Sequence, residues 1–459
     1  MASRSAGGHD SIFFYWIDMK NKYLYIETFG CQMNVHDSEQ MAALLAGVGY
    51  QLTENSEQAD LILINGCSIR AKAEQKAFSE LGRLIKLKEQ NPLLIVGFGG
   101  CLAQHLGKKV FSRMPAVDLV FGTHNIHRLP EMIAAVQKER KKIKHTDFST
   151  KITSLNIFAP PPKGSLCAFV SIMQGCDNYC AYCVVPYLRG PEMSRKPEDI
   201  IDEIQKLTKL GVKEVTLLGQ NVNSYGKKLD HGCNFVSLIK KINKIVGVER
   251  IRFTTSHPKD LSDELIDCFA DVPKLCEHIH MPVQSGSNSV LKLMNRGYSI
   301  EDYLEKIKRL RSVCPRISIT SDIIVGFPGE TQEDYQETIN LMEKIRFDLL
   351  FSFKYSERKG TAAQKLQDNV PEAVKRQRLE DLQALQDRHT QEKNSALEGS
   401  VQEVLVEGQS KNSEKDMMGR TRSWKIVNFK GGPELIGKQV DIKIIKGHLH
   451  SLRGKIEEA

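Results

Sequence analysis

Three cysteines stand close together near the middle of the chain, at Cys176, Cys180 and Cys183. They directly follow a predicted strand and fall in a loop. Three thiolates at this spacing can hold three irons of a four-iron cluster and leave the fourth iron open to a small chelating ligand, such as the amine and carboxylate of S-adenosylmethionine. A structural zinc site is the alternative, but it normally takes four ligands, and no fourth cysteine or histidine follows nearby. The spacing therefore favours a [4Fe–4S] cluster.

Three more cysteines, Cys31, Cys67 and Cys101, each follow a different predicted strand of the first part of the chain, and each lies next to glycine. The ends of neighbouring parallel strands converge on the crevice where ligands bind. Glycine lets the backbone approach closely there. The pattern indicates either a second cluster with an open iron or a set of buried or redox thiols. The other five cysteines show no ligand spacing and are interpreted as ordinary thiols: Cys167, Cys233, Cys268, Cys276 and Cys314.

An α/β domain with an open parallel sheet is predicted over residues 22–140, where strand and helix patterns alternate. Short apolar runs predict strands at 23–28, 60–65, 93–97 and 117–121. Helices are predicted at 38–46 and 73–89, and a further one begins at Pro130. Such a domain brings the ends of its strands, and hence the first three cysteines, to one edge.

A basic and proline-rich segment, 141–163, predicts a linker, and the strand–helix alternation resumes over 164–394. Strands are predicted at 168–172, 215–218, 251–254, 278–281 and 319–324, with a helix starting at Pro197. Five or six such units indicate a full or partial βα barrel, whose chemistry lies at the carboxyl ends of its strands. Over 395–459 the pattern changes to strands at 401–406, 423–429 and 440–445, which predicts a small all-β barrel.

The composition of the chain constrains where the protein works. It has 459 residues, a formal net charge of +8 and no apolar run approaching the roughly 20 residues that span a bilayer. Residues 1–21 resemble a disordered extension, in which Met19 is a possible alternative start, and not a signal peptide. An odd number of cysteines without an export signal predicts reduced thiols and a cytoplasmic protein without membrane contact. The mild positive charge permits a nucleic-acid partner, although on this fact alone a solvated surface of mixed charge is the favoured explanation.

With both cysteine sets in view, the chain from about residue 22 onward resembles the methylthiotransferase family of radical S-adenosylmethionine enzymes. That family joins a three-cysteine domain, a radical S-adenosylmethionine barrel and a C-terminal RNA-binding TRAM barrel. Segments 173–190, 218–226 and 253–258 resemble its tRNA-modifying branch. Asn65 departs from the family pattern, in which threonine is more usual before the cysteine.

The resemblance implies an enzyme that adds a methylthio group to C2 of N6-isopentenyladenosine 37 in tRNA, giving 2-methylthio-N6-isopentenyladenosine. It implies two [4Fe–4S] clusters and S-adenosyl-L-methionine as cofactors. Cys176, Cys180 and Cys183 would hold the cluster that cleaves S-adenosylmethionine, and the other set would hold the cluster that presents sulfur. The expected partners are a tRNA bearing isopentenyladenosine 37, an electron donor and a sulfur source, and we expect a monomer.

Further site residues follow from the resemblance, each with a simpler alternative. Tyr182 would border the adenine of the cofactor or simply pack, and Gly326 and Glu330 would lie beside S-adenosylmethionine or form a strand–turn–helix junction. Residues 284–287 would line the pocket or form a turn. Four residues of the last domain combine charge with an aromatic ring and predict RNA contact, or else an ordinary surface strand: Arg420, Arg422, Trp424 and Lys425.

Three other functions stay open on the sequence. A ribosomal-protein aspartate or threonylcarbamoyl-adenosine in tRNA can be the target of the same chemistry, although segments 220–226 and 254–258 argue against both. A non-catalytic RNA-binding protein that holds zinc at the cysteines is the third.

Overall fold

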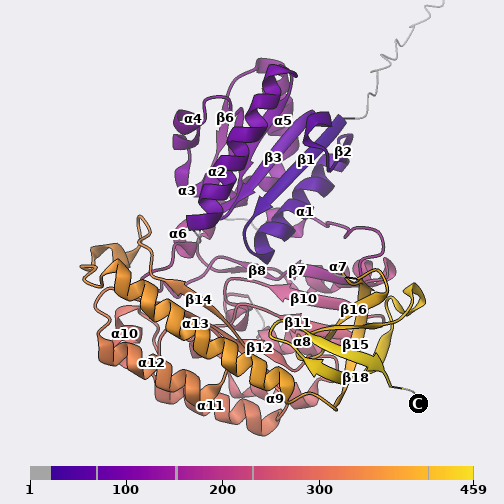
Figure 1. Cartoon of the computed structure of the whole chain (residues 1–459). Coiled ribbons are helices and arrows are strands. Elements are labelled where there is room, and N and C mark those ends of the chain that lie inside the picture. Colours follow the sequence, from indigo (N-terminus) through magenta and orange to yellow (C-terminus); the bar gives the residue numbers. More distant parts are fainter. Residues whose placement is uncertain (1–21, 69–70, 150–152, 230–231, 412, 458–459) are drawn as a thin grey trace, which may run out of the picture.

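The computed structural model describes residues 22–68, 71–149, 153–229, 232–411 and 413–457, which form three successive units (Figure 1). The predicted extension 1–21, including Met19, lies outside the described residues. Within the described part of the chain, no helix combines the length and apolar character needed to cross a membrane.

The first unit is a six-stranded parallel sheet in the order β2-β1-β3-β4-β5-β6, which confirms the predicted open α/β domain. The strands are β1 (Lys22–Phe29), β2 (Tyr50–Leu52), β3 (Leu61–Gly66), β4 (Ile95–Gly99), β5 (Leu119–Phe121) and β6 (Ile143–His145). Ile62 and Ile64 pack on one face of β3, and Leu61 and Leu63 pack on the other, as expected for a strand buried on both sides. Strand β6 lies inside the segment predicted as a linker, and it extends this sheet instead.

The helices of this unit are α1 (Gln32–Ala46), α2 (Ala71–Ile85), α3 (Gly100–Leu106), α4 (Lys109–Arg113) and α5 (Leu129–Glu139). Helix α1 begins six residues before the predicted start at 38. Its first turns carry Asn34, His36 and Asp37, which are polar yet buried, so the apolar pattern that marks a buried helix face is missing there. Helix α3 was not predicted, because it is short and starts at a glycine.

The second unit is a partial βα barrel of six strands, in two three-stranded parallel sheets that follow chain order. They are β7 (Cys167–Ser171), β10 (Glu214–Leu218), β11 (Arg250–Phe253), β12 (His278–His280), β13 (Ser318–Val325) and β14 (Leu349–Lys354). The helices are α6 (Val185–Arg189), α7 (Pro197–Lys209), α8 (Phe235–Asn243), α9 (Asp263–Asp271), α10 (Asn288–Leu293), α11 (Ile300–Val313), α12 (Gln332–Ile345) and α13 (Glu372–Ser395). Strands β8 (Met173–Gln174) and β9 (Met193–Ser194) pair as a two-stranded antiparallel ribbon. Strand β8 precedes the cysteine loop and α6, and β9 follows them. The predicted barrel is confirmed, with β14 as a strand that the sequence did not indicate.

The third unit is a closed five-stranded barrel, as predicted for the all-β tail. Its strands are β15 (Val401–Gln409), β16 (Asp416–Thr421), β17 (Ile426–Lys430), β18 (Gln439–Gly447) and β19 (Leu452–Ile456). Strands β16 and β19 escaped prediction, because each contains glycine and charged residues that dilute the strand pattern.

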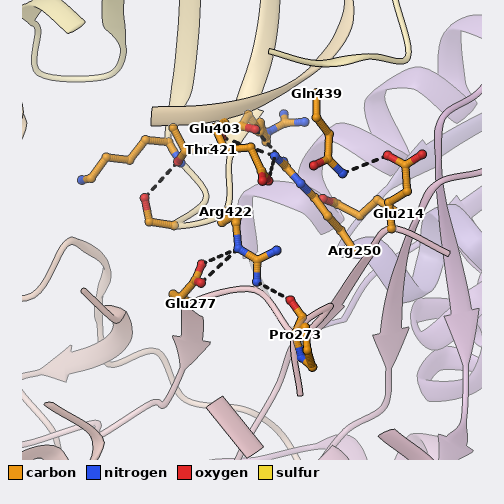
Figure 2. Close-up of polar contacts among 12 residues, drawn as sticks. Glu214, Arg250, Pro273, Glu277, Glu403, Thr421, Arg422 and Gln439 are labelled. Atoms are coloured by element: carbon orange, nitrogen blue, oxygen red, sulfur yellow. Dashed lines mark hydrogen bonds and ion pairs between the residues drawn. The ribbon is translucent and has the colours of Figure 1, made fainter. Parts of the chain in front are cut away.

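This small barrel packs against the beginning of strand β11 of the larger one (Figure 2). The Arg250 side chain is fully buried, and its Nη1 donates to the carbonyl oxygen of Arg420 at 2.7 Å, while Nη2 forms an ion pair with Glu403 at 2.9 Å. Arg252 donates from Nη1 to the carbonyl oxygen of Arg422 at 2.7 Å. Buried guanidinium groups with several acceptors fix orientation as well as contact, so the two barrels are joined in one defined geometry.

The four residues predicted to bind RNA lie at this contact and have partners within the protein, and their part in RNA binding stays a prediction. Arg422 donates to both carboxylate oxygens of Glu277, at 3.0 and 2.8 Å, and to the carbonyl oxygen of Pro273 at 2.9 Å (Figure 2). The Trp424 ring stacks on His278 and lies below the guanidinium groups of Arg252 and Arg420. Lys425 bonds Asn394 at 2.8 Å, and Arg420 pairs with Glu407. Arg422, Trp424 and Lys425 thus contact the larger barrel, whereas the Arg420 side chain pairs within its own barrel.

Candidate active site between the first two units

Cys31, Cys67 and Cys101 lie at the carboxyl ends of β1, β3 and β4, three neighbouring strands of one parallel sheet. Cys31 caps the start of α1, Cys67 follows β3 directly, and Cys101 is the second residue of α3. The backbone N–H of Cys67 donates to the carbonyl oxygen of Phe29, which ties two of these strand ends together at 2.8 Å. The topology thus brings the dispersed set to one edge of the sheet.

A buried amide network, which the sequence did not indicate, holds these strand ends. The side chain of Asn34 donates to Asn65 Oδ1 at 3.1 Å, and the Asn65 side chain donates to the carbonyl oxygen of Asn34 at 2.8 Å and to Ser38 Oγ at 3.0 Å. Gly100, at φ 85°, leaves the space that Asn65 fills, since a Cβ there would stand 2.1 Å from Asn65 Oδ1. Asn65, the departure from the family pattern, therefore has a structural role beside Cys67.

Cys176, Cys180 and Cys183 lie on the loop between β8 and α6. The N–H of Cys183 donates to the carbonyl oxygen of Cys180 at 2.9 Å, and the N–H of Val185 donates to Cys183 Sγ at 3.4 Å. Burial raises the pKa of the Cys176 thiol to about 11 and that of Cys183 to about 12, and the neighbouring thiols add to both shifts. All six cysteines of the two sets are free thiols, as ligands of a metal cluster must be.

Arg296 and His257 face Cys180 from other parts of the barrel. Arg296 is 4% exposed and donates from Nη1 to Cys180 Sγ at 3.3 Å. Burial lowers the pKa of His257 to about 2, so its ring is neutral. Its Nδ1 accepts from the N–H of Lys259 at 3.2 Å, which leaves the proton on Nε2, 3.9 Å from Cys180 Sγ. Both groups present N–H to sulfur, as residues around a ligated thiolate do.

Arg189, at the end of α6, reaches from the barrel into the first unit. Its Nε donates to Cys101 Sγ at 3.3 Å and its Nη2 forms an ion pair with Asp37 at 2.6 Å, with both side chains 3% exposed. Its remaining nitrogen, Nη1, is buried without a hydrogen-bond partner among the described residues. Burial raises the pKa of the Cys101 thiol, and the guanidinium opposes that rise. A buried cation with an unused donor beside two thiols fits a bound anionic group such as an iron–sulfur cluster.

Helix α6 lies where the first unit meets the barrel (Figure 1). Val184, next to Cys183, and Leu188, next to Arg189, pack with Cys101 in one apolar cluster. His124 of the first unit lies 3.0 Å from the carbonyl oxygen of Arg189. The segment from Cys183 through α6 to Arg189 therefore links the barrel cysteine loop to Cys101 of the sheet set.

The placement of the thiols bears on the zinc alternative. Across the described residues, no three His, Cys, Asp or Glu side chains form a group that could hold a metal ion. A zinc site needs all its ligands around one ion, at about 2.3 Å for sulfur. The thiolates of a four-iron cluster bind different irons and stand farther apart, so a cluster does not need this close grouping.

The predicted cofactor residues have partners within the protein. Tyr182 accepts from Arg296 Nη1 at 3.3 Å and packs beside Ala181 and Phe327. Glu330 forms an ion pair with Arg378 at 2.6 Å and accepts a hydrogen bond from the N–H of Gly326 at 2.8 Å. It therefore holds the turn against α13. The turn nonetheless lies beside the cysteine loop, through the packing of Phe327 on Ala181.

Several buried polar atoms in and around that loop have no hydrogen-bond partner among the described residues. Four buried atoms without a partner among the described residues belong to the cysteine loop or to segments that follow β10, β11 and β12: Asn178 Nδ2, Asn223 Oδ1, Ser256 Oγ and Gln284 Oε1. Buried polar atoms normally have partners. A polar ligand such as S-adenosylmethionine, bound at the carboxyl ends of the strands, would supply them. Of these four residues, only Gln284 lies in the segment, 284–287, that the sequence predicts to line the cofactor pocket.

Comparisons with known proteins agree with this division of the chain. Three family models match it: an uncharacterized protein family, UPF0004, over residues 23–122, the radical SAM superfamily over 170–342 and the TRAM domain over 395–456. A protein of Syntrophus aciditrophicus, named tRNA-2-methylthio-N(6)-dimethylallyladenosine synthase, is 58% identical over 96% of this chain and 95% of its own length. One of the same name from Geobacter metallireducens is 53% identical over 95% of this chain and 98% of its own.

Solved structures share the fold at low identity. The radical S-adenosylmethionine methyltransferase TsrM from Kitasatospora setae matches with a TM-score of 0.55 and 14% identity, over 72% of this chain and 73% of that one. The cobalamin-dependent S-adenosylmethionine radical enzyme OxsB matches with a TM-score of 0.51 and 14% identity, over 80% of this chain and 56% of its own. Both likenesses cover a larger share of this chain than a barrel alone would.

Proposed function

The chain belongs to the family of tRNA-2-methylthio-N(6)-dimethylallyladenosine synthases, and we propose that it adds a methylthio group to C2 of N6-isopentenyladenosine 37 in tRNA. The observation that carries the proposal is that the segment from Cys183 to Arg189 joins the loop of the barrel cysteines to Cys101 of the sheet set. A reaction that needs both hydrogen abstraction and sulfur delivery at one carbon requires two such centres close together.

The target explains why these cofactors are needed. The hydrogen on C2 of adenine is neither acidic nor easily displaced, so proton transfer to a base is a poor route. Two [4Fe–4S] clusters and S-adenosyl-L-methionine supply the radical and the sulfur chemistry when bound. Cys176, Cys180 and Cys183 would hold one cluster, and Cys31, Cys67 and Cys101 would hold the other.

The residues of the chain contribute position and charge to this chemistry. Arg296 and the Nε2 proton of His257 direct N–H groups at Cys180 Sγ, and Arg189 directs one at Cys101 Sγ. Donors to sulfur stabilise the more negative, reduced form of a cluster. The asparagine network of Asn34 and Asn65 keeps the strand ends in place while substrate and cofactor exchange.

The partners follow from the reaction. A substrate tRNA, an external electron donor and a sulfur source are required, and we propose that the enzyme acts as a monomer in the cytoplasm, where tRNA is modified. The anticodon loop suits the enzyme as a target, because its bases can unstack without the cost of opening a duplex.

Nucleoside mass spectrometry after a competition assay tests the proposal. Reconstituted protein, S-adenosylmethionine and one reductant are mixed with tRNAs carrying adenosine, N6-isopentenyladenosine or N6-threonylcarbamoyl-adenosine at position 37. We expect methylthiolation of the isopentenyl form, since five apolar carbons gain about 0.8 kcal/mol for each buried CH₂. Equal modification of plain adenosine would contradict the apolar recognition. Preference for the threonylcarbamoyl form, or activity only on a ribosomal protein, would move the chain to another branch.

A further inference from the structure

Two tyrosine rings stand open to solvent beside the cysteines. Tyr179, between Cys176 and Cys180, and Tyr187, on α6, are each 48% exposed. Their ring centroids are 6.2 Å apart with an interplanar angle of 77°, an edge-to-face pair. Large aromatic side chains that gather on a surface mark a contact site more often than scattered ones do.

The backbone holds Tyr179 in this exposed position. Its φ is 46°, in the left-handed region that non-glycine residues seldom adopt. Asn295 Nδ2 donates to the carbonyl oxygen of Tyr179 at 3.0 Å, which anchors this turn of the loop. Strained backbone held by specific contacts is characteristic of functional sites. The exposure of the ring is therefore a built feature of the loop.

The pair lies where a substrate must bind if both cysteine sets act on it. Tyr179 belongs to the loop of the barrel cysteines, whereas Tyr187 lies one residue from Leu188, which packs on Cys101. Two lysines contact the loop. Lys259 Nζ donates to the side-chain oxygen of Asn178 at 2.8 Å, and this neutral partner does not cancel the lysine's charge. Lys228, 51% exposed, forms an ion pair with Asp177. Aromatic rings among cations suit unpaired bases and their phosphates.

We propose that Tyr179 and Tyr187 form a stacking platform for unpaired bases of the anticodon loop, adjacent to the adenosine that is modified. This proposal rests on the proposed function and adds to it the protein surface that grips the loop. The rings stack on bases without reading their identity, because every base has an aromatic face. The platform therefore holds many loop sequences, while the group on the adenosine provides the selection.

Binding of an anticodon stem-loop RNA by the full-length protein tests the platform without catalysis. The RNA carries isopentenyladenosine 37 and a neighbouring 2-aminopurine, whose fluorescence falls on stacking. We expect Tyr179→Ala and Tyr187→Ala each to weaken binding about tenfold and to restore the fluorescence. Tyr179→Phe and Tyr187→Phe should bind as the unchanged protein does, since stacking needs the ring and not the hydroxyl. The slope of log affinity against log salt should stay the same, because no phosphate contact is lost.

Leu210→Ala serves as the matched control, since Leu210 is a similarly exposed apolar side chain, at 52%, located at the end of α7. It should leave both affinity and fluorescence unchanged. If the alanine variants bind the loop as tightly as the parent, with quenched fluorescence, the platform is wrong. If the parent itself binds the stem-loop no better than a duplex of equal length, the proposed tRNA substrate fails first. Thermal unfolding of each variant separates a lost contact from a lost fold.

Discussion

The two cysteine sets reach similar ends by opposite means. The barrel set lies within one short loop, so its spacing is fixed by local backbone and is visible in the sequence. The sheet set takes one thiol from each of three strands, so its geometry depends on strand order and on the buried Asn34–Asn65 network. A local site tolerates changes in the surrounding fold, whereas a dispersed one fails when any of its strands moves.

Each set also has one buried arginine that donates to a cysteine sulfur, but the origins of these arginines differ. Arg296 comes from the same barrel as Cys180 and bonds the carbonyl oxygen of Pro282 at 2.6 Å. Arg189 comes from the barrel but serves Cys101 of the neighbouring unit and pairs with Asp37 there. The barrel site is therefore complete within its own unit, and the sheet site is complete only when both units are assembled.

Removal of each cysteine set should give the largest difference between the sites. Replacing Cys176, Cys180 and Cys183 with alanine should remove about half of the iron and abolish both 5′-deoxyadenosine formation and methylthiolation. Replacing Cys31, Cys67 and Cys101 should remove the other half and abolish methylthiolation alone. Iron analysis and chromatography of the products measure this. Equal loss of 5′-deoxyadenosine formation in both variants would contradict the separate roles of the two sets.

Stability should distinguish the two arginines next. Arg189→Gln leaves Asp37 buried without its partner and should cost about 3–5 kcal/mol of unfolding free energy. The double variant Arg189→Gln with Asp37→Asn removes both charges and should recover most of that loss. Denaturant unfolding of the single and double variants gives the coupling energy. A double variant as unstable as Arg189→Gln would show that packing, and not the ion pair, matters here.

Each arginine should affect the reduction potential of only the cluster whose cysteine it contacts. In a protein that keeps only the barrel cysteines, Arg296→Gln should make the potential of the remaining cluster more negative, because a donor to sulfur that favours the reduced form is lost. In a protein that keeps only the sheet cysteines, the charge-neutral Arg189→Gln/Asp37→Asn variant should do the same. Arg296→Gln in the protein with only the sheet cysteines, and the Arg189→Gln/Asp37→Asn variant in the protein with only the barrel cysteines, should leave the cluster potential unchanged. Titrations followed by electron paramagnetic resonance decide, and unmoved potentials would reduce both arginines to packing residues.

The smallest effect is expected at Tyr182. Tyr182→Phe removes one hydrogen bond from Arg296, at 3.3 Å, and should cost about 1 kcal/mol of stability with iron content unchanged. Thermal unfolding and iron analysis measure the two. Loss of iron in this variant would give the hydroxyl a direct part in holding the cluster.

The same contrast explains what the sequence could reveal. The barrel cysteines, the parallel sheets and the all-β tail all follow from local spacing and periodicity. Arg296, Asn34 and Asn65 belong to no local pattern, because their roles depend on contacts between distant segments. Arg189 and His257 lay inside segments already noted as family markers, yet nothing in their spacing indicated a bond to sulfur. The contacts that the residues around Trp424 make with the larger barrel could not be predicted, since charge and aromaticity do not distinguish a partner molecule from a neighbouring domain.

Helix α6 has a consequence for how the protein can be taken apart. The three family models match separate, successive parts of the chain, which invites expression of the first two units as separate proteins. Cutting between them would expose Leu188, leave Arg189 and Asp37 charged without each other, and strip Cys101 of its donor. The two units should therefore melt as one cooperative block, and neither should retain a properly formed site alone. A substitution at this helix, in either unit, should therefore affect the cysteine sites of both units.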